Sequence, residues 1–169
     1  IQDFGVSYEE LEPFFDYAEK VFGTSGQAWT VNGQLVGEGK GGNPYAPDRS
    51  HHFPLESQKN TVSAQLFQKA ANEVGYKPYN LPSANTSGPY SPPYGPHMGP
   101  CNLCGFCSGY VCYMYSKASP NVNILPALKP LPNFELRPNA HVIRVNLDST
   151  KTKATGVTYI DAMGREIEQ

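Results

Sequence analysis

All four cysteines of this chain lie in one short stretch, and their spacing is the feature of the sequence best suited to chemistry. They follow the pattern C-x2-C-x2-C-x4-C within the segment GPCNLCGFCSGYVC. Thiolates bind soft metal centres such as zinc and iron–sulfur clusters. We therefore interpret the stretch as a candidate metal site with the ligands Cys101, Cys104, Cys107 and Cys112.

The spacing favours an iron–sulfur cluster over zinc. Three ligands at steps of three residues are typical of the ferredoxin run C-x2-C-x2-C-x3-C-P, whereas structural zinc sites usually draw on two separated pairs. The last gap here is four residues long, and Tyr113 stands where that run has its proline. This departure argues against a four-iron cluster and leaves a three-iron cluster open.

Two other interpretations of the cysteines stay open. Disulfides within so short a segment would close small loops and constrain the unfolded chain little. Free cysteines are among the most buried residue types, so a packed loop of thiols without metal is the second alternative. Its aromatic neighbours would be Phe106, Tyr110, Tyr113 and Tyr115.

No other stretch predicts a catalytic group. His51, His52 and His97 lie in polar or proline-rich segments, where an exposed histidine without a role is the usual case. The sequence contains no recognisable Ser-His-Asp grouping and no HExxH motif, and GEGKGG lacks the strand-then-helix context of a phosphate loop. We therefore predict no catalytic residue in this chain.

The composition predicts much irregular backbone. The 169 residues include 16 glycines and 16 prolines, and they form no repeat. A formal charge of −2 gives no basic field for nucleic acid, and no apolar run approaches the roughly 18 residues of a membrane span. We expect neither nucleic-acid binding nor a transmembrane segment in this chain.

Three segments predict helices. Residues 7–22 begin with a capping box formed by Ser7 and Glu10, and Pro13 is expected to kink or split this helix. The glycine- and proline-rich residues 37–54 predict a long surface loop, which we expect near a substrate entrance or a subunit contact. The other two predicted helices cover residues 60–74 and about 119–128.

The last third of the sequence predicts strands, because Val, Ile, Thr and Tyr dominate it. Ile143, Val145 and Leu147 alternate with polar residues, as in a half-buried strand. The predicted fold class is α+β, with two or three helices, long irregular loops and a C-terminal antiparallel β-meander. We predict a boundary between a segment 1–132 and a segment 133–169.

Six phrases occur in an order that resembles the glucose–methanol–choline family of FAD-dependent oxidoreductases. They are FGVSYEELEPFFDYAEKVFG, GGNPY, GPCNLCGFCSGYVC, YSKASP, NFELRPNAHVIRVN and ATGVTYIDAMGRE. Among the branches of the family, the chain looks most like the bacterial gluconate 2-dehydrogenase flavoprotein subunits and related sugar dehydrogenases. The residues YS before Lys117 depart from the GA of many relatives.

The resemblance implies that this chain is the middle portion of a larger protein. Its Gly-rich dinucleotide loop and catalytic histidine would lie outside these residues, with 1–132 belonging to the substrate domain and 133–169 to the FAD domain. The family's adenine contact, made by the backbone of a valine after N-x-E-L, matches Val142. We expect the chain alone neither to bind FAD tightly nor to turn over substrate, and Ile143, Val145 and Leu147 to be exposed in it.

The resemblance also implies a function for the parent protein. It would oxidise an alcohol or a sugar acid such as gluconate, passing hydride to FAD, and an iron–sulfur cluster would relay electrons to cytochrome c or a quinone. A small subunit and the periplasmic face of the bacterial inner membrane are the implied partner and location. The alternative is a small non-catalytic metal-binding or interaction module that the cysteine-rich loop staples together.

Overall fold

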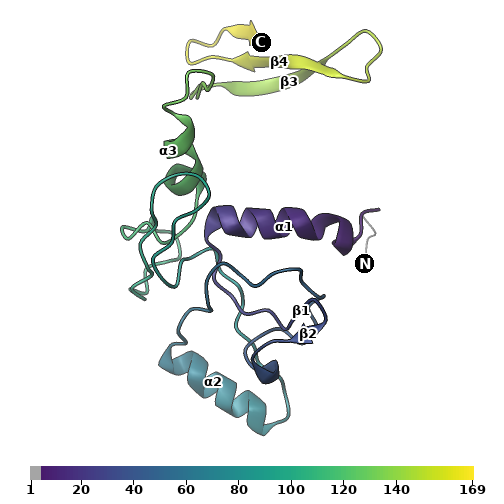
Figure 1. Ribbon diagram of the computed structural model, residues 1–169. Coiled ribbons are helices and arrows are strands. Elements are labelled where there is room, and N and C mark those ends of the chain that lie inside the picture. The colour runs from purple at the N-terminus through teal and green to yellow at the C-terminus, as the bar shows by residue number, and fades with distance from the viewer. Residues whose placement is uncertain (1–4) are drawn as a thin grey trace. The chain divides into compact units, whose positions relative to one another are not determined.

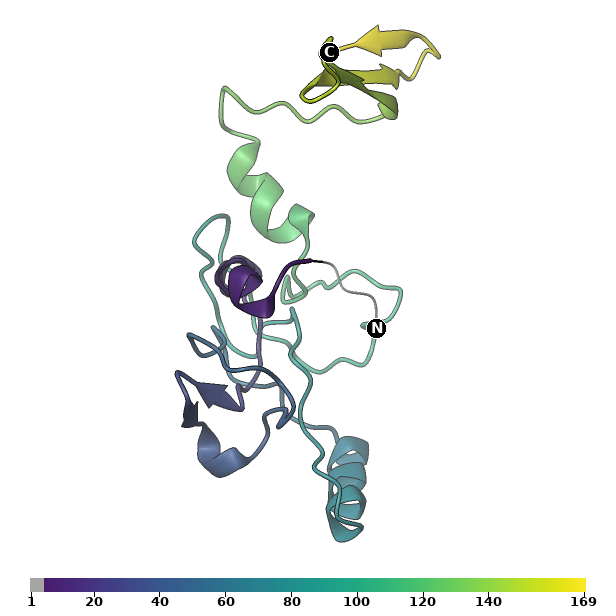
Figure 2. The same cartoon turned by 90° about the vertical axis from the view of Figure 1, so that its right-hand side faces the viewer.

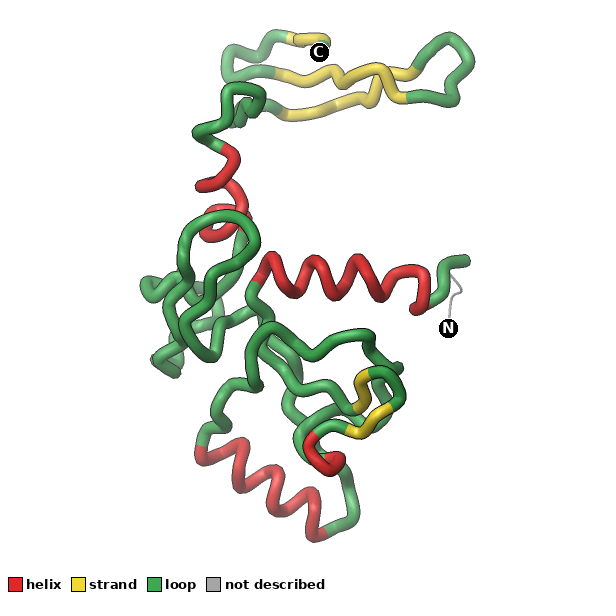
Figure 3. The backbone as a smooth tube through the Cα atoms, in the orientation of Figure 1, coloured by secondary structure: helices red, strands yellow, loops and turns green. Residues whose placement is uncertain are grey.

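The computed structural model describes residues 5–169; residues 1–4, the start of the predicted first segment, lie outside the described part. The chain forms two compact units, one ending at Pro130 and one spanning Leu131–Gln169. Within the described residues there are three α-helices and two antiparallel sheets, so the predicted α+β class is confirmed (Figure 1). Long loops join these elements in the first unit (Figure 3).

Helix α1 (Tyr8–Phe22) has the predicted ends. The Glu10 amide donates to Ser7 Oγ at 3.2 Å, and the Ser7 amide donates to Glu10 Oε2 at 2.8 Å, which completes the capping box. Gly23 ends the helix with a left-handed backbone, φ 65°. Pro13 does not split the helix, because its missing N–H removes a single hydrogen bond near the exposed N-terminal end.

Helix α2 (Val62–Glu73) begins after Thr61, whose hydroxyl accepts a hydrogen bond from the Ala64 amide at 3.3 Å. The predicted position is therefore confirmed to within two residues at the N-terminus. Ala71 is the buried residue of this helix, whereas its large apolar side chains are exposed to solvent. They include Val62, Leu66 and Phe67.

The third predicted helix consists of two parts. A π-helical turn, η2 (Pro120–Ile124), leads into α3 (Leu125–Leu128), and Figure 2 shows them as one continuous coil. In η2 the Leu125 amide reaches back to the Pro120 carbonyl. The wider turn suits the sequence because Pro126 has no N–H with which to form a regular α-helical bond.

A small hairpin in the first unit was missed by the sequence analysis. Strands β1 (Thr30–Val31) and β2 (Gln34–Leu35) pair antiparallel, and a short 3-10 turn η1 (Gly37–Gly39) follows. The connecting residues Asn32 and Gly33 have φ values of 49° and 73°. These positive values belong to a type I′ turn, for which Asn-Gly is the preferred sequence.

The second unit contains the predicted β-meander. Strands β3 (His141–Leu147), β4 (Ala154–Ile160) and β5 (Glu166–Glu168) form an antiparallel sheet in the order β3-β4-β5. An irregularity interrupts the β3–β4 register between Val142 and Arg144. Because β3 lies at the end of the order β3-β4-β5, it has one paired edge and one open edge.

Burial in this sheet is concentrated on β4. Thr158 and Tyr159 are 1% and 7% exposed, whereas the apolar residues of β3 lie near 50% exposure. The prediction that β3 is half-buried is wrong for this chain, and the prediction that its apolar residues are exposed is confirmed. The cause is the small size of the unit, in which nothing packs over β3. The exposed residues are Val142, Ile143, Val145 and Leu147.

We predict that the exposed apolar residues of β3 make the isolated chain self-associate, because burying them against a second copy removes apolar surface from water. Val145→Lys is expected to lower the associated fraction in sedimentation velocity. Met163→Lys is the matched control, because Met163 is also exposed but lies in the β4–β5 turn. Equal association of both variants would contradict the prediction.

Candidate functional site

The cysteine-rich stretch, which we call the sulfur loop (residues 101–112), lies in the first unit and begins and ends at a closed neck. The neck consists of residues 84–86, 98–101 and 116–118. Thr86 lies at its centre: its amide donates to the Ser116 carbonyl at 3.0 Å, and its carbonyl accepts from the Cys101 amide at 2.8 Å. Thr86 and Ser116 are both fully buried. The two ends of the loop are thus fixed to the same residue.

Buried hydroxyl groups complete the neck. Thr86 Oγ1 contacts the Gly99 carbonyl at 2.6 Å and Ser116 Oγ at 3.0 Å, and Ser116 Oγ donates to the Thr86 carbonyl at 3.1 Å. A side chain at Gly99 would place its Cβ 2.6 Å from the Met114 carbonyl oxygen, so only glycine fits there. Hydrogen bonds and close packing therefore hold the neck on both sides of the loop.

Cys112 lies where the loop returns to the neck. Burial raises the pKa of this thiol. The backbone amides of Lys117, Ser116 and Met114, together with the Lys117 charge, lower the pKa by more than burial raises it. The net pKa therefore lies below its usual value. N–H donors and a nearby cation favour the thiolate, the form that binds metals.

Cys107 and Cys101 have weaker contacts of the same kind. The Asn85 amide group lies 3.9 Å from Cys107 Sγ, and the Leu103 amide lies 3.4 Å from Cys101 Sγ. Lys117 Nζ donates to the Cys107 carbonyl at 2.7 Å. Cys104 is exposed, and the structure gives its sulfur no hydrogen-bond partner among residues 5–169.

The predicted ligands are brought into one loop but are not gathered around one point. All four are free thiols, and no three His, Cys, Asp or Glu side chains in residues 5–169 are arranged to hold a metal ion. The donor chemistry fits a soft metal centre, whereas the observed positions do not. Cys104 and Cys107 are exposed, which argues against a packed loop of buried thiols. The assignment as metal ligands stays a prediction.

Val142, the predicted adenine contact, lies on the open edge of the second unit's sheet. Val157 and Gln169 exchange two hydrogen bonds between β4 and β5. Because bonded and non-bonded pairs alternate along an antiparallel ladder, Tyr159 also turns its main-chain groups toward β5. Its partner Val142 then directs its N–H and C=O to the open edge, as does Val145 opposite Val157. Main-chain groups that could meet an adenine edge are thus available at Val142.

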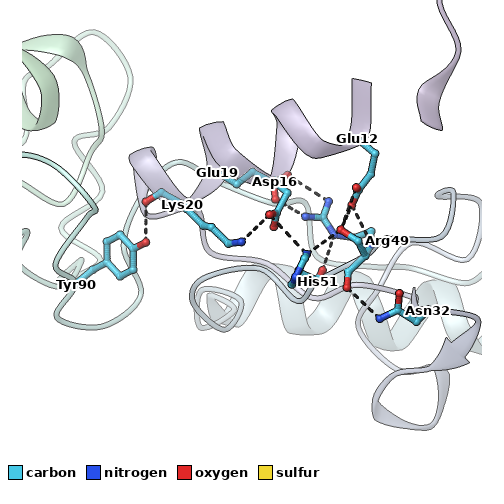
Figure 4. A network of polar contacts seen from close by, with 9 residues as sticks. Glu12, Asp16, Glu19, Lys20, Asn32, Arg49, His51 and Tyr90 are labelled. Atoms are coloured by element: carbon cyan, nitrogen blue, oxygen red, sulfur yellow. Dashed lines mark hydrogen bonds and ion pairs between the residues drawn. The ribbon is translucent and has the colours of Figure 1, made fainter. Parts of the chain in front are cut away.

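A network of charges, drawn in Figure 4, ties the long loop to α1. The Arg49 guanidinium binds both carboxylate oxygens of Glu19 and lies 3.9 Å from the centre of the Phe53 ring. The side chains of Arg49 and Glu19 are only 11% and 20% exposed. The ion pair therefore acts in a partly desolvated setting, where losing one partner leaves the other uncompensated.

The same network brings together a serine, a histidine and an aspartate that the sequence did not connect. Ser50 Oγ lies 2.8 Å from His51 Nδ1, and Asp16 Oδ2 lies 3.6 Å from the same nitrogen. A catalytic triad needs the two partners on opposite ring nitrogens. Ser50 Oγ is also bonded to Glu12, and Asp16 to Lys20. The group is a structural clamp and not a nucleophile with its base.

Comparison with known proteins finds relatives that match most or all of this chain. It is 71% identical over all 169 of its residues to a gluconate 2-dehydrogenase flavoprotein of Pantoea cypripedii. The chain resembles a gluconate 2-dehydrogenase flavoprotein along its whole length. The resemblance predicted from the sequence phrases is thereby confirmed. A paromamine 6'-oxidase of Streptomyces fradiae is 27% identical over 157 residues, or 92% of the chain.

The chain covers 28% and 24% of the lengths of these two relatives, respectively. No family model matches it. None of the helices in residues 5–169 has both the length and the apolar character that crossing a membrane requires.

Several residues that shape the sulfur loop were missed from the sequence. Asn85 and Thr86 are separated from Ser116 and Lys117 by about 30 positions, and no local pattern connects them. Arg49 was missed for the same reason, because its partner Glu19 lies 30 residues away. In each case a tertiary contact, and not a motif, gives the residue its role.

We predict that Arg49→Met lowers the free energy of unfolding by about 2 kcal/mol, because it leaves the Glu19 carboxylate partly buried without its cation. Lys40→Met is the matched control: Lys40 pairs with Glu38, but both side chains are at least 80% exposed. Exposed pairs contribute about 0–1 kcal/mol. Urea unfolding measures the free energy of unfolding of both variants. Equal losses of this free energy would contradict the larger contribution predicted for the Arg49 pair.

Proposed function

We propose that this chain is a segment of an FAD-dependent dehydrogenase of the glucose–methanol–choline family that oxidises a sugar acid such as gluconate. The observation that carries the proposal is the 71% identity, over the whole chain, to a protein named gluconate 2-dehydrogenase flavoprotein. The distant relative named as an oxidase supports the broader class of oxidoreductase. Neither relative supports a non-catalytic metal-binding module.

In this proposal the substrate loses a proton to a base and a hydride from its hydroxyl-bearing carbon, which leaves a carbonyl. FAD, when bound, accepts that hydride. We assign no catalytic residue to this chain. Its contribution is to position the reactants: residues 1–132 would form part of the substrate domain, with loop 37–54 near the substrate entrance or a subunit contact, and residues 133–169 part of the FAD domain.

The part of the chain that we assign to FAD is the open edge of β3. An adenine edge pairs with one main-chain N–H and one C=O in the manner of a neighbouring strand, and Val142 directs both groups outward by the alternation of the ladder. The Val142 side chain is 52% exposed, so a flat ring system can approach. A contact of this kind contributes about 0.5–1.5 kcal/mol per hydrogen bond.

We predict that Val142→Pro in the full-length protein weakens FAD binding about three- to tenfold, because it removes the outward N–H without breaking the β3–β4 ladder. Val145→Pro is the control, since it removes an equally outward N–H three residues away. FAD dissociation, followed by flavin fluorescence, compares the FAD affinities of the two variants. Normal FAD binding by Val142→Pro would contradict the assignment of Val142 to the FAD site.

We further propose that the sulfur loop holds an iron–sulfur cluster in the full-length protein. Such a cluster would pass electrons singly to cytochrome c or a quinone, with a small subunit at the periplasmic face of the inner membrane. The N–H groups near Cys107 Sγ and Cys101 Sγ support the proposal, because such hydrogen bonds stabilise and tune sulfur-ligated centres. The spacing of the four cysteines is the other support.

We predict that the full-length protein, purified without oxygen, contains iron and acid-labile sulfide in proportion to its FAD. Chemical analysis of iron and sulfide measures this directly, and visible absorption after removal of FAD gives a second readout. Zinc in place of iron would identify a structural zinc site. Absence of both metals would leave the cysteines as free thiols and end the cluster proposal.

A further inference from the structure

The turn between β1 and β2 contains the single Asn-Gly pair of the sequence, Asn32–Gly33. Both residues are exposed to solvent. Asparagine is a labile residue, and a following glycine has no Cβ to hinder attack by its backbone nitrogen on the asparagine side chain. The turn therefore carries a pair of residues suited to deamidation.

Three consecutive residues, 48–50, hold the groups that take part in this reaction. The Gly33 amide donates to Asp48 Oδ2 at 2.8 Å, and the Asn32 amide donates to the Arg49 carbonyl at 2.8 Å. The Asn32 side-chain amide donates to the Ser50 carbonyl at 3.0 Å (Figure 4). The attacking nitrogen and the leaving nitrogen are thus both hydrogen-bonded to the 48–50 segment.

The 48–50 segment is itself anchored to α1. Ser50 donates its amide to Glu12 Oε1 at 2.9 Å and its hydroxyl to the same oxygen at 2.8 Å. The Arg49 guanidinium binds the Glu19 carboxylate. Loss of the Glu12 contact therefore loosens the segment that restrains the turn, although Glu12 forms no hydrogen bond with Asn32 or Gly33 in the described chain.

We propose that Asn32 is a site of spontaneous deamidation and that release of the 48–50 segment sets its rate. The Gly33 nitrogen forms a bond to Asn32 Cγ, the Cγ–Nδ2 bond breaks, and ammonia leaves with the proton lost from the Gly33 nitrogen. Water then opens the resulting succinimide ring to aspartate or isoaspartate. While Asp48 accepts the Gly33 N–H, that proton stays on the attacking nitrogen. The reaction therefore requires local opening of the contacts with the segment.

Deamidation also removes one contact that holds the 48–50 segment. The carboxylate formed at position 32 has no N–H to donate to the Ser50 carbonyl, and its negative charge lies beside that oxygen. The product therefore holds the segment less firmly than asparagine does.

The first experiment follows deamidation of the full-length protein in mildly alkaline buffer by peptide mapping with mass spectrometry. Asp48→Ala is expected to speed the reaction at Asn32 about two- to tenfold, the effect of losing one typical hydrogen bond on the population of the open turn. Glu12→Ala is expected to act in the same direction. Unchanged rates in both variants overturn the proposal.

Glu56→Ala is the matched control for these variants. Glu56 is exposed, and its carboxylate has no hydrogen-bond or ion-pair partner among residues 5–169. Its substitution is expected to leave the rate at Asn32 unchanged, and an acceleration equal to that of Asp48→Ala contradicts the proposal. Circular dichroism shows whether each variant is folded.

The second experiment needs no variant. Deamidation at Asn32 in the native full-length protein is expected to be at least about tenfold slower than in the same protein unfolded in urea, because unfolding removes all three contacts with the 48–50 segment. Equal rates in the two states would show that the segment gives no protection, and would overturn the proposal.

The effect of the product is measured by trypsin, which cleaves after arginine and so reports exposure of the bond between Arg49 and Ser50. Asn32→Asp in the full-length protein is expected to speed cleavage at this bond severalfold. Asn139→Asp is the control, because Asn139 is also exposed and has a similar φ of 55° but lies in the second unit. Equal cleavage of the two variants contradicts a looser segment.

Discussion

The paired hydroxyl groups of Thr86 and Ser116 are the constraint on which the sulfur loop depends. Both residues are fully buried, and their side chains satisfy each other and the main chain of the loop's two ends. Buried polar groups are costly unless they are all paired, so this cluster has one acceptable arrangement. The sulfur loop can be exposed to solvent because these contacts hold its two ends together. The contacts of Asn85 and Lys117 with Cys107 come from the residues next to this cluster.

Local signals decided how much of the fold could be predicted. The Ser7–Glu10 capping box and the alternation around Val145 act within a few residues, so α1 and the β-meander were found. The Asn32–Gly33 turn is an equally local signal for a hairpin and was overlooked because its strands are only two residues long. Burial was the weaker prediction, because it depends on what packs against an element and not on its own pattern.

The sequence predicted which residues form the candidate site, but not how they are arranged in space. The four cysteines were identified from spacing alone, but the neck depends on Thr86 meeting Ser116, a contact that closes 30 residues of chain. The same holds for Arg49 and Glu19. The exposure of apolar side chains on α2 and β3 has a related origin, since it depends on what packs against each element and not on the local pattern.

The irregularity in β3 between Val142 and Arg144 has a consequence for how its open edge behaves. A second strand adding to that edge would need an unbroken ladder of hydrogen bonds, and a bulge interrupts the ladder where it would begin. A small flat ligand needs only one or two such bonds and is not affected. The irregular edge is therefore a poor template for adding another strand, whereas single main-chain groups along it can still form isolated hydrogen bonds.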